Sequence, residues 1–202
     1  MQLTAHCDTG CKCSATAPCL EMKQVTIWTV GHSTRTIEQF IELLTRQSIQ
    51  LLADVRRFPG SRRLPHFNQE NLSKSLANAG IEYVHFPELG GRRKALPNSP
   101  NNAWRSEAFR GYADFMMTPE FHAGIDRLLT FAREKRTAIM CAEALWWQCH
   151  RSLIADYLKA SGHAVLNILA ANKVEEHPFT SAARIVGGKL SYGAETEPQF
   201  LF

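Results

Sequence analysis

The segment MCAEALWWQCHR (Met140 to Arg151) places two cysteines, a glutamate, a histidine and an arginine within one short stretch. Such residues suit a metal site, a catalytic thiol or an anion-binding helix start, or they simply mark a strand-to-helix turn. A phosphatase-type loop has an arginine six residues after its catalytic cysteine. The residue six positions after Cys141 is Trp147, which excludes such a loop. Two adjacent residues seldom both ligate one ion, so we expect no metal at this segment. We interpret Cys141 and Cys149 as buried structural thiols.

Carboxylates and a histidine near strand ends are the candidate catalytic groups. Glu143 follows the apolar run TAIMCA and is placed for acid/base work, and His150 begins the next helix. Asp54 closes the apolar run LLADV, where a carboxylate is costly unless it is paired or functional. The sequence therefore leaves Asp54 as a base, a metal ligand or a structural partner of Arg56 or Arg57.

Candidate anion-binding groups follow the other strand-like runs. The segment from Arg56 to Lys94 has eight basic and three acidic residues, while the whole chain has a net charge of +4. Guanidinium groups match phosphate in charge and geometry, and glycines or helix starts present backbone N–H groups to anions. A solvated basic face is the competing interpretation. The anion-binding set that we predict is His32, Ser33, Arg56, Arg62, Gly90, Gly91, Arg92 and Arg151.

Alternating strand-like and helical segments must position these groups. We expect strands at 25–30, 51–55, 81–86, 137–142 and 163–169, and helices at 36–47, 68–80, 104–117, 119–135 and 149–160. The residues after Ala170 show little periodicity. This alternation predicts an α/β fold, a three-layer open sheet of about five mainly parallel strands with helices on both faces. Ligands of such sheets bind at the carboxyl ends of the strands.

Length and composition predict one globular domain, residues 22–202, preceded by an extension. The chain has 202 residues, 45% hydrophobic and 21% charged, which is ordinary globular usage. Residues 1–21 spell C-x3-C-x-C-x5-C without paired C-x2-C knuckles, so we expect a disordered extension rather than a zinc site. There is no membrane-length apolar run and no apolar signal segment, so we expect a soluble cytoplasmic protein without a membrane partner.

Several ordered motifs resemble one family of bacterial and archaeal proteins. They are GHST, LLADVRRFPGSRRLPHFN, GIEYVHFPELGGR, GYADFM, MCAE…CHR and HPFTSAARI. On these motifs the chain resembles the family called domain of unknown function 488. The resemblance implies recurring positions without a mechanism: Gly31, His32, Ser33, Asp54, Arg56, Pro59, Ser61, Tyr83, Leu89, Gly90, Gly91, Cys141, Glu143, Cys149, His150 and Arg151. The chain departs from the family pattern at ALWW (144–147) and at Asn167, where the family often has histidine.

Three functions compete at this stage. The first is an enzyme acting on a phosphate-bearing substrate, a nucleotide or nucleic acid, at the carboxyl ends of the strands. The second is a non-catalytic module that binds nucleotides or nucleic acid with the same face. The third, a thiol redox or metal protein, is least favoured, and we predict no cofactor.

Overall fold

The computed structural model describes residues 24–194. Its strands are β1 Thr26–Gly31, β2 Leu51–Asp54, β3 Glu82–His85, β4 Thr137–Cys141, β5 Ala164–Ala170, β6 Lys173–Glu176, β7 Arg184–Val186 and β8 Lys189–Ser191. Its helices are α1 Ile37–Arg46, α2 Gln69–Asn78, α3 Glu107–Phe115, α4 Pro119–Glu134 and α5 Arg151–Ala160. Short 3₁₀ turns occur at Pro65–Phe67, Pro87–Leu89 and Trp146–Gln148. The predicted extension, residues 1–21, lies outside the described residues.

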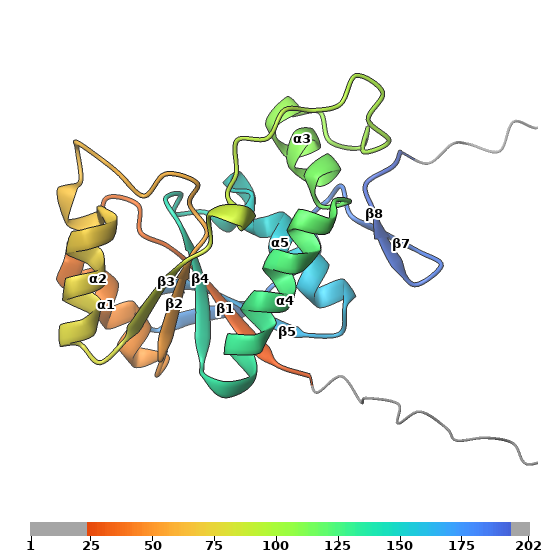
Figure 1. The fold of residues 1–202 in the computed structure, drawn as a ribbon. Helices are drawn as coiled ribbons and strands as arrows, with labels where there is room; N and C mark the ends of the chain where they lie inside the picture. Colours follow the sequence, from red (N-terminus) through yellow and green to blue (C-terminus); the bar gives the residue numbers. More distant parts are fainter. Residues whose placement is uncertain (1–23, 195–202) are drawn as a thin grey trace, which may run out of the picture.

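The strands form a six-stranded sheet of order β3-β2-β4-β1-β5-β6. β1 to β5 are mutually parallel, and β6 pairs antiparallel with β5. The connections after β1 and β2 run toward β3, whereas those after β3 and β4 run back toward β5. Right-handed crossovers therefore place α1 and α2 on one face and α4 and α5 on the other (Figure 1). The predicted three-layer α/β fold is confirmed, with β6 as an additional edge strand.

Two hydrophobic cores lie on the two faces of this sheet. Trp28, Val30 and Met140 pack with Phe40 of α1 and Leu76 of α2. The intervening strand residues, which point the other way because side chains alternate along a strand, pack against the opposite helices. That second core includes Ile27, Ile139, Phe121 of α4 and Leu153 of α5. Both faces of the central strands are buried, which explains why their sequences lack polar alternation.

Local signals explain where the helices begin. Thr36 and Gln39 form a capping box before α1, and the Thr118 side chain accepts from the Phe121 N–H before α4. Two predicted helices are too long at their first turn, because α3 begins at Glu107 and α5 at Arg151. For α5 the reason is a 3₁₀ turn over Trp146–Gln148, which leaves Cys149 extended before the helix.

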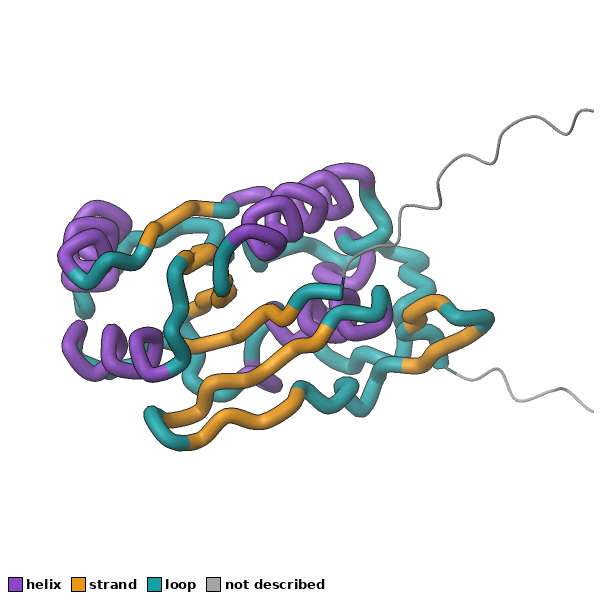
Figure 2. The backbone as a smooth tube through the Cα atoms, turned by 90° about the horizontal axis from the view of Figure 1, so that it is seen from below, coloured by secondary structure: helices purple, strands orange, loops and turns teal. Residues whose placement is uncertain are grey.

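Three short strands follow Ala170, where the sequence analysis predicted no element. β6 extends the large sheet, and β7 and β8 form a separate hairpin, seen at the right of Figure 2. Asp156 of α5 fastens this segment, accepting hydrogen bonds from His177 Nε2, Thr180 N, Thr180 Oγ1 and Tyr192 Oη. Among the described helices, none is long and apolar enough to cross a membrane.

Candidate functional site

A cavity of about 720 Å³ opens at the carboxyl ends of the parallel strands. The segments after β1, β2, β3 and β4 line it, together with α3 and the residues before α5. β1 and β4 are neighbours whose onward connections run in opposite directions, so the cavity lies at a topological switch point. The sequence pattern predicts a ligand site at the carboxyl ends of the strands, and the cavity lies at that place.

Asp54 and Arg56 form a buried ion pair beneath this cavity. Arg56 Nη2 lies 2.6 Å and Nε 2.9–3.1 Å from the Asp54 carboxylate, which also accepts from Tyr83 Oη at 2.7 Å. Asp54 is fully buried and does not line the cavity, whereas Arg56 does. Of the alternatives that the sequence left open for Asp54, this geometry supports the structural partner of Arg56.

His32 is held as a neutral ring beside that pair. Its Nδ1 donates to the Ser33 carbonyl at 2.9 Å, so its Nε2 accepts from Arg56 Nη1 at 3.3 Å. Burial, aided by the positive charge of Arg56, lowers the pKa of His32 to about 4. The ring also stacks on Phe67 at a centroid distance of 4.1 Å. His32 and Ser33 both line the cavity, and His32 contributes there as a neutral, fixed side chain.

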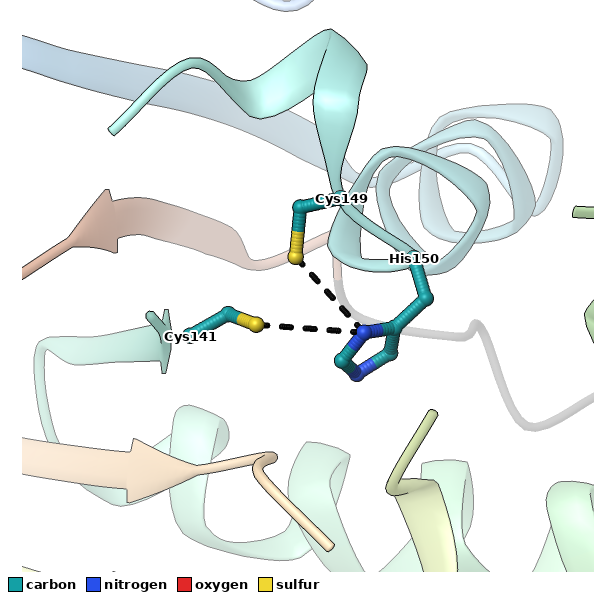
Figure 3. Close-up of side chains that lie close together, drawn as sticks. All are labelled: Cys141, Cys149 and His150. Carbon is teal, nitrogen blue, oxygen red and sulfur yellow. Dashed lines mark hydrogen bonds between the residues drawn. The ribbon is translucent and has the colours of Figure 1, made fainter. Parts of the chain in front are cut away.

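Cys141, Cys149 and His150 form a cluster on the cavity wall (Figure 3). Cys141 ends β4, and the other two residues immediately precede α5. His150 Nδ1 lies 3.8 Å from Cys141 Sγ and 3.6 Å from Cys149 Sγ. The hydrogen bond with Cys149 outweighs burial and lowers the pKa of Cys141, while burial raises the pKa of Cys149. Among residues 24–194 neither thiol forms a disulfide, and both are buried. Their role as structural thiols stays a prediction.

Glu143, Arg57 and Arg92 carry the exposed charges of the cavity wall. Within residues 24–194, neither the Glu143 carboxylate nor the Arg92 guanidinium takes part in a hydrogen bond or ion pair. The Arg57 guanidinium lies 5.8 Å from the Phe58 ring centroid, also in the cavity wall. One carboxylate and two cations are therefore open to a ligand.

Gly90 and Gly91 allow two close backbone approaches. A Cβ on Gly90 would lie 2.7 Å from Arg57 Cα, and one on Gly91 would lie 2.8 Å from His150 Nδ1. Gly91 lines the cavity and Gly90 does not. Their requirement for glycine thus comes from packing against Arg57 and His150.

Arg151 and Arg62 lie outside the cavity lining. Arg151 is 1% exposed, and its guanidinium donates to the carbonyls of Glu143 at 2.6 Å and Ala144 at 2.9 Å. It thereby shapes the loop that carries Glu143. Arg62 is exposed on the loop after β2.

Sequence reasoning missed the apolar part of the cavity wall. Phe58, Phe109 and Tyr112 line it, and Tyr112 packs its ring 4.9 Å from that of His150. Phe109 and Tyr112 are three residues apart in α3, a spacing that puts both on one helix face. The spacing of Phe109 and Tyr112 could have indicated a shared aromatic face. The order of the elements along the chain did not predict that α3 packs over the strand ends.

The two departures from the family motifs have structural explanations. Trp146 packs 4.8 Å from the His177 ring, and neither Trp146 nor Trp147 lines the cavity. Asn167 accepts from Thr29 Oγ1 at 2.8 Å, and its amide Nδ2 lies 3.2 Å from His177 Nδ1. Both positions therefore contribute to the anchoring of the segment after β6.

Comparisons with known proteins place this arrangement in a family. Neither the curated proteins nor the solved structures that were searched gave a match to the chain. A family described as "Domain of unknown function DUF488" matches residues 36–158, which is more than half of the chain. The match includes the strand ends after β2, β3 and β4, and excludes GHST and HPFTSAARI. The chain therefore belongs to the DUF488 family.

Proposed function

We propose that this protein is an enzyme that acts on a phosphate-bearing substrate, a nucleotide or nucleic acid, in the strand-end cavity. The observation that carries the proposal is that two exposed arginines, Arg57 and Arg92, line the same cavity as Glu143, whose carboxylate is unpaired among the described residues. Each group comes from the loop after a different strand. Protein cavities of roughly 300–1,000 Å³ suit small molecules and cofactors, and this one falls within that range.

The two arginines supply phosphate recognition. Their forked N–H donors match phosphate oxygens, and both are exposed, so binding does not require either to leave a buried partner. Arg56 is neutralised by Asp54 and extends this positive edge only weakly. Phe58 and Phe109 provide apolar surface for a base or sugar on the same wall.

Glu143 supplies acid/base catalysis in this proposal. Its backbone carbonyl is fixed by Arg151, while the side chain lines the cavity and its carboxylate has no partner within residues 24–194. A carboxylate held this way can accept a proton from a water molecule or a substrate hydroxyl. Asp54 lacks that freedom because its oxygens already bind Arg56 and Tyr83.

The test of binding compares arginines inside and outside the cavity. Labelled nucleotides and a short oligonucleotide are titrated against the wild type, Arg57→Ala, Arg92→Ala and Arg62→Ala. We expect each cavity variant to weaken binding by about 10-fold, the loss of one charge-assisted contact. Arg62→Ala is the matched control, since Arg62 is an exposed arginine of the same basic segment. Equal weakening by Arg62→Ala, or no binding by the wild type, contradicts the proposal.

The test of catalysis uses Glu143→Gln. With a bound nucleotide identified, product formation is followed by chromatography. Glu143→Gln should abolish turnover while leaving the dissociation constant within about twofold, because the amide retains shape but accepts no proton. Unchanged turnover in this variant contradicts the assigned role.

One observation favours a nucleic-acid-binding module as the second candidate. A neighbouring cavity of about 570 Å³ shares Phe109 with the first and is lined by Trp104 and Arg105. Trp104 stacks on Phe109 at 4.7 Å, which gives this surface an aromatic floor. Two adjoining hollows fit a ligand longer than a mononucleotide. Tighter binding of an oligonucleotide than of a mononucleotide, without turnover of either, would select this alternative.

A further inference from the structure

Three potential ligand atoms converge at the junction of β4 and α5. The side-chain atoms of Cys141, Cys149 and His150 all lie within 4.8 Å of one another. Figure 3 shows both sulfurs directed at one nitrogen, His150 Nδ1. Cys141 Sγ lies 3.8 Å and Cys149 Sγ 3.6 Å from this nitrogen. These distances are properties of the protein alone, so the argument from them does not depend on the proposed substrate.

The distances fit the edges of a tetrahedron around a metal ion. With zinc bonds of about 2.3 Å to sulfur and about 2.1 Å to nitrogen, a tetrahedral angle separates sulfur and nitrogen by about 3.6 Å. The two sulfur-to-Nδ1 distances, 3.8 and 3.6 Å, lie close to that value. The third edge, between the two sulfurs, is at most 4.8 Å, so closing the group around an ion requires movement of the thiol side chains alone.

The imidazole is already held in the orientation of a ligand. His150 Nε2 donates to the Val55 carbonyl at 3.0 Å, because a carbonyl can only accept. In the neutral ring this leaves Nδ1 with one lone pair, which can serve one thiol hydrogen but not two. A metal ion would satisfy both sulfurs at once. A histidine that binds a metal through one ring nitrogen usually donates the N–H of its other ring nitrogen to a carbonyl, a carboxylate or water, which fixes the orientation of the ring.

The adjacency of Cys149 and His150 does not prevent joint ligation. Cys149 is extended, with φ −133° and ψ 145°, whereas His150 has φ −55° and ψ −19°. The change of backbone conformation between them turns both side chains toward Cys141. The sequence argument against a metal was that two adjacent residues seldom both ligate one ion. Here Cys149 and His150 both precede α5, which begins at Arg151, and they differ in backbone conformation.

We propose that Cys141, Cys149 and His150 bind a divalent cation of the zinc type, with the fourth coordination position facing the strand-end cavity. All three residues line that cavity, and no fourth His, Cys, Asp or Glu of the described chain joins the group. Three protein ligands and one open position are typical of catalytic rather than structural zinc. Two thiolates and an imidazole favour zinc over magnesium or calcium, which prefer oxygen ligands. The open position would take a water molecule or a substrate oxygen.

The experiment uses the full-length chain with Cys7, Cys11, Cys13 and Cys19 replaced by serine, so that the cysteines before residue 20 cannot bind metal. Metal content is measured by mass spectrometry, and zinc affinity by competition with a chromophoric chelator. We expect one equivalent of zinc. Cys141→Ser, Cys149→Ser and His150→Gln should each weaken zinc binding by more than about 100-fold. Losing a residue that only hydrogen-bonds to a metal ligand already costs about 10–100-fold in metal affinity.

Two control variants separate this site from its surroundings and from the proposed function. His66→Gln removes a histidine outside the cavity lining, and Glu143→Gln removes the proposed acid/base group. Both should retain one equivalent of zinc. Failure to bind nucleotides would overturn the proposed function and leave zinc binding unaffected, so the two proposals fail separately.

Two further measurements use the protein without substitutions at Cys141, Cys149 or His150. Their results therefore do not depend on whether such variants fold. Cobalt(II) added to the metal-free protein should give thiolate-to-cobalt charge-transfer absorption of a tetrahedral site. Zinc should also slow alkylation of Cys141 and Cys149, followed by peptide mass spectrometry. The proposal is overturned if zinc and cobalt do not bind, or if zinc stays bound with unchanged affinity in folded Cys141→Ser.

Discussion

At the scale of the residue, Asp54 shows how burial decides between two roles that one side chain can play. A carboxylate at a strand end can act as a base or can neutralise a neighbouring cation. Here the carboxylate is fully buried, and its oxygens bind Arg56 and Tyr83. Breaking a buried pair is costly because the remaining charge stays uncompensated. The role assigned to Asp54 is therefore to hold Arg56, whose guanidinium in turn contacts the His32 ring.

Asp54→Asn should lower the free energy of unfolding by about 3 kcal/mol, because the Arg56 cation is left without its anion. Tyr83→Phe is the milder companion and should cost about 1 kcal/mol, the value of one hydrogen bond. Urea denaturation followed by circular dichroism measures both. Wild-type stability of Asp54→Asn together with lost turnover would instead make Asp54 a catalytic base.

Gly91 and Gly60 offer a matched pair of substitutions in the same cavity wall. Gly91→Ala sets a Cβ 2.8 Å from His150 Nδ1, so the imidazole must move, whereas a Cβ at Gly60 meets no atom of the described residues within 4 Å. Gly91→Ala should cost about 1–3 kcal/mol of stability through overpacking. Gly60→Ala should be neutral or gain up to about 1 kcal/mol by restricting the unfolded chain. Thermal unfolding of the two variants compares them directly, and equal midpoints would refute the close contact.

Among the helices and strands, those predicted correctly from the sequence have a clear hydrophobic pattern or a helix cap. Thr36 and Thr118 cap the helices expected after them, and the apolar runs form the central parallel strands. The strands after Ala170 have only three or four residues, too few for a period to show. β6 is fixed by pairing with β5, and β7 and β8 pair with each other. Asp156 anchors residues 177–192 through hydrogen bonds between residues far apart in the sequence, which local patterns do not reveal. The Cys149–His150 geometry likewise depends on where α5 begins, and helix boundaries are poorly specified by local sequence.

His163, immediately before β5, is buried, and neither ring nitrogen has a hydrogen-bond partner among residues 24–194. Burial, with the positive charge of Arg133, lowers the pKa of His163 below its usual 6.5. The unfolded chain therefore binds a proton at a higher pH than the folded chain does. Protonation of His163 therefore favours the unfolded chain, so the folded protein loses stability as the pH falls below 6.5 toward the folded pKa.

His163→Leu should therefore stabilise the protein, by about 1 kcal/mol at neutral pH, since an unsatisfied polar group is replaced by an apolar one. The gain should increase as the pH falls below 6.5, because leucine has no proton to bind. Urea unfolding midpoints of the wild type and the variant at several pH values test this. A difference between the two proteins that shrinks toward acid pH would contradict the assigned pKa direction.

At the scale of the whole molecule, α5 connects the cavity with the chain after β6. Its first turn follows the Cys149–His150 pair, while Asp156 in its middle accepts four hydrogen bonds from residues 177–192. Tyr192 packs near Trp104, which lines the second cavity, at 5.8 Å. The C-terminal strands thus stabilise the helix that presents His150, although they lie outside the family match at 36–158.

Asp156→Ala should therefore destabilise the protein globally, by about 3–5 kcal/mol, because four donors lose one buried acceptor. Hydrogen exchange should rise first in the amides of 177–180, of which Thr180 N binds Asp156 directly, and then across α5. Glu175→Ala is the control, since it breaks an exposed ion pair with Lys173 and should change stability by less than about 1 kcal/mol. Exchange that rises in 177–192 while α5 stays as protected as in the wild type would show that the C-terminal segment does not support the helix bearing the cavity residues.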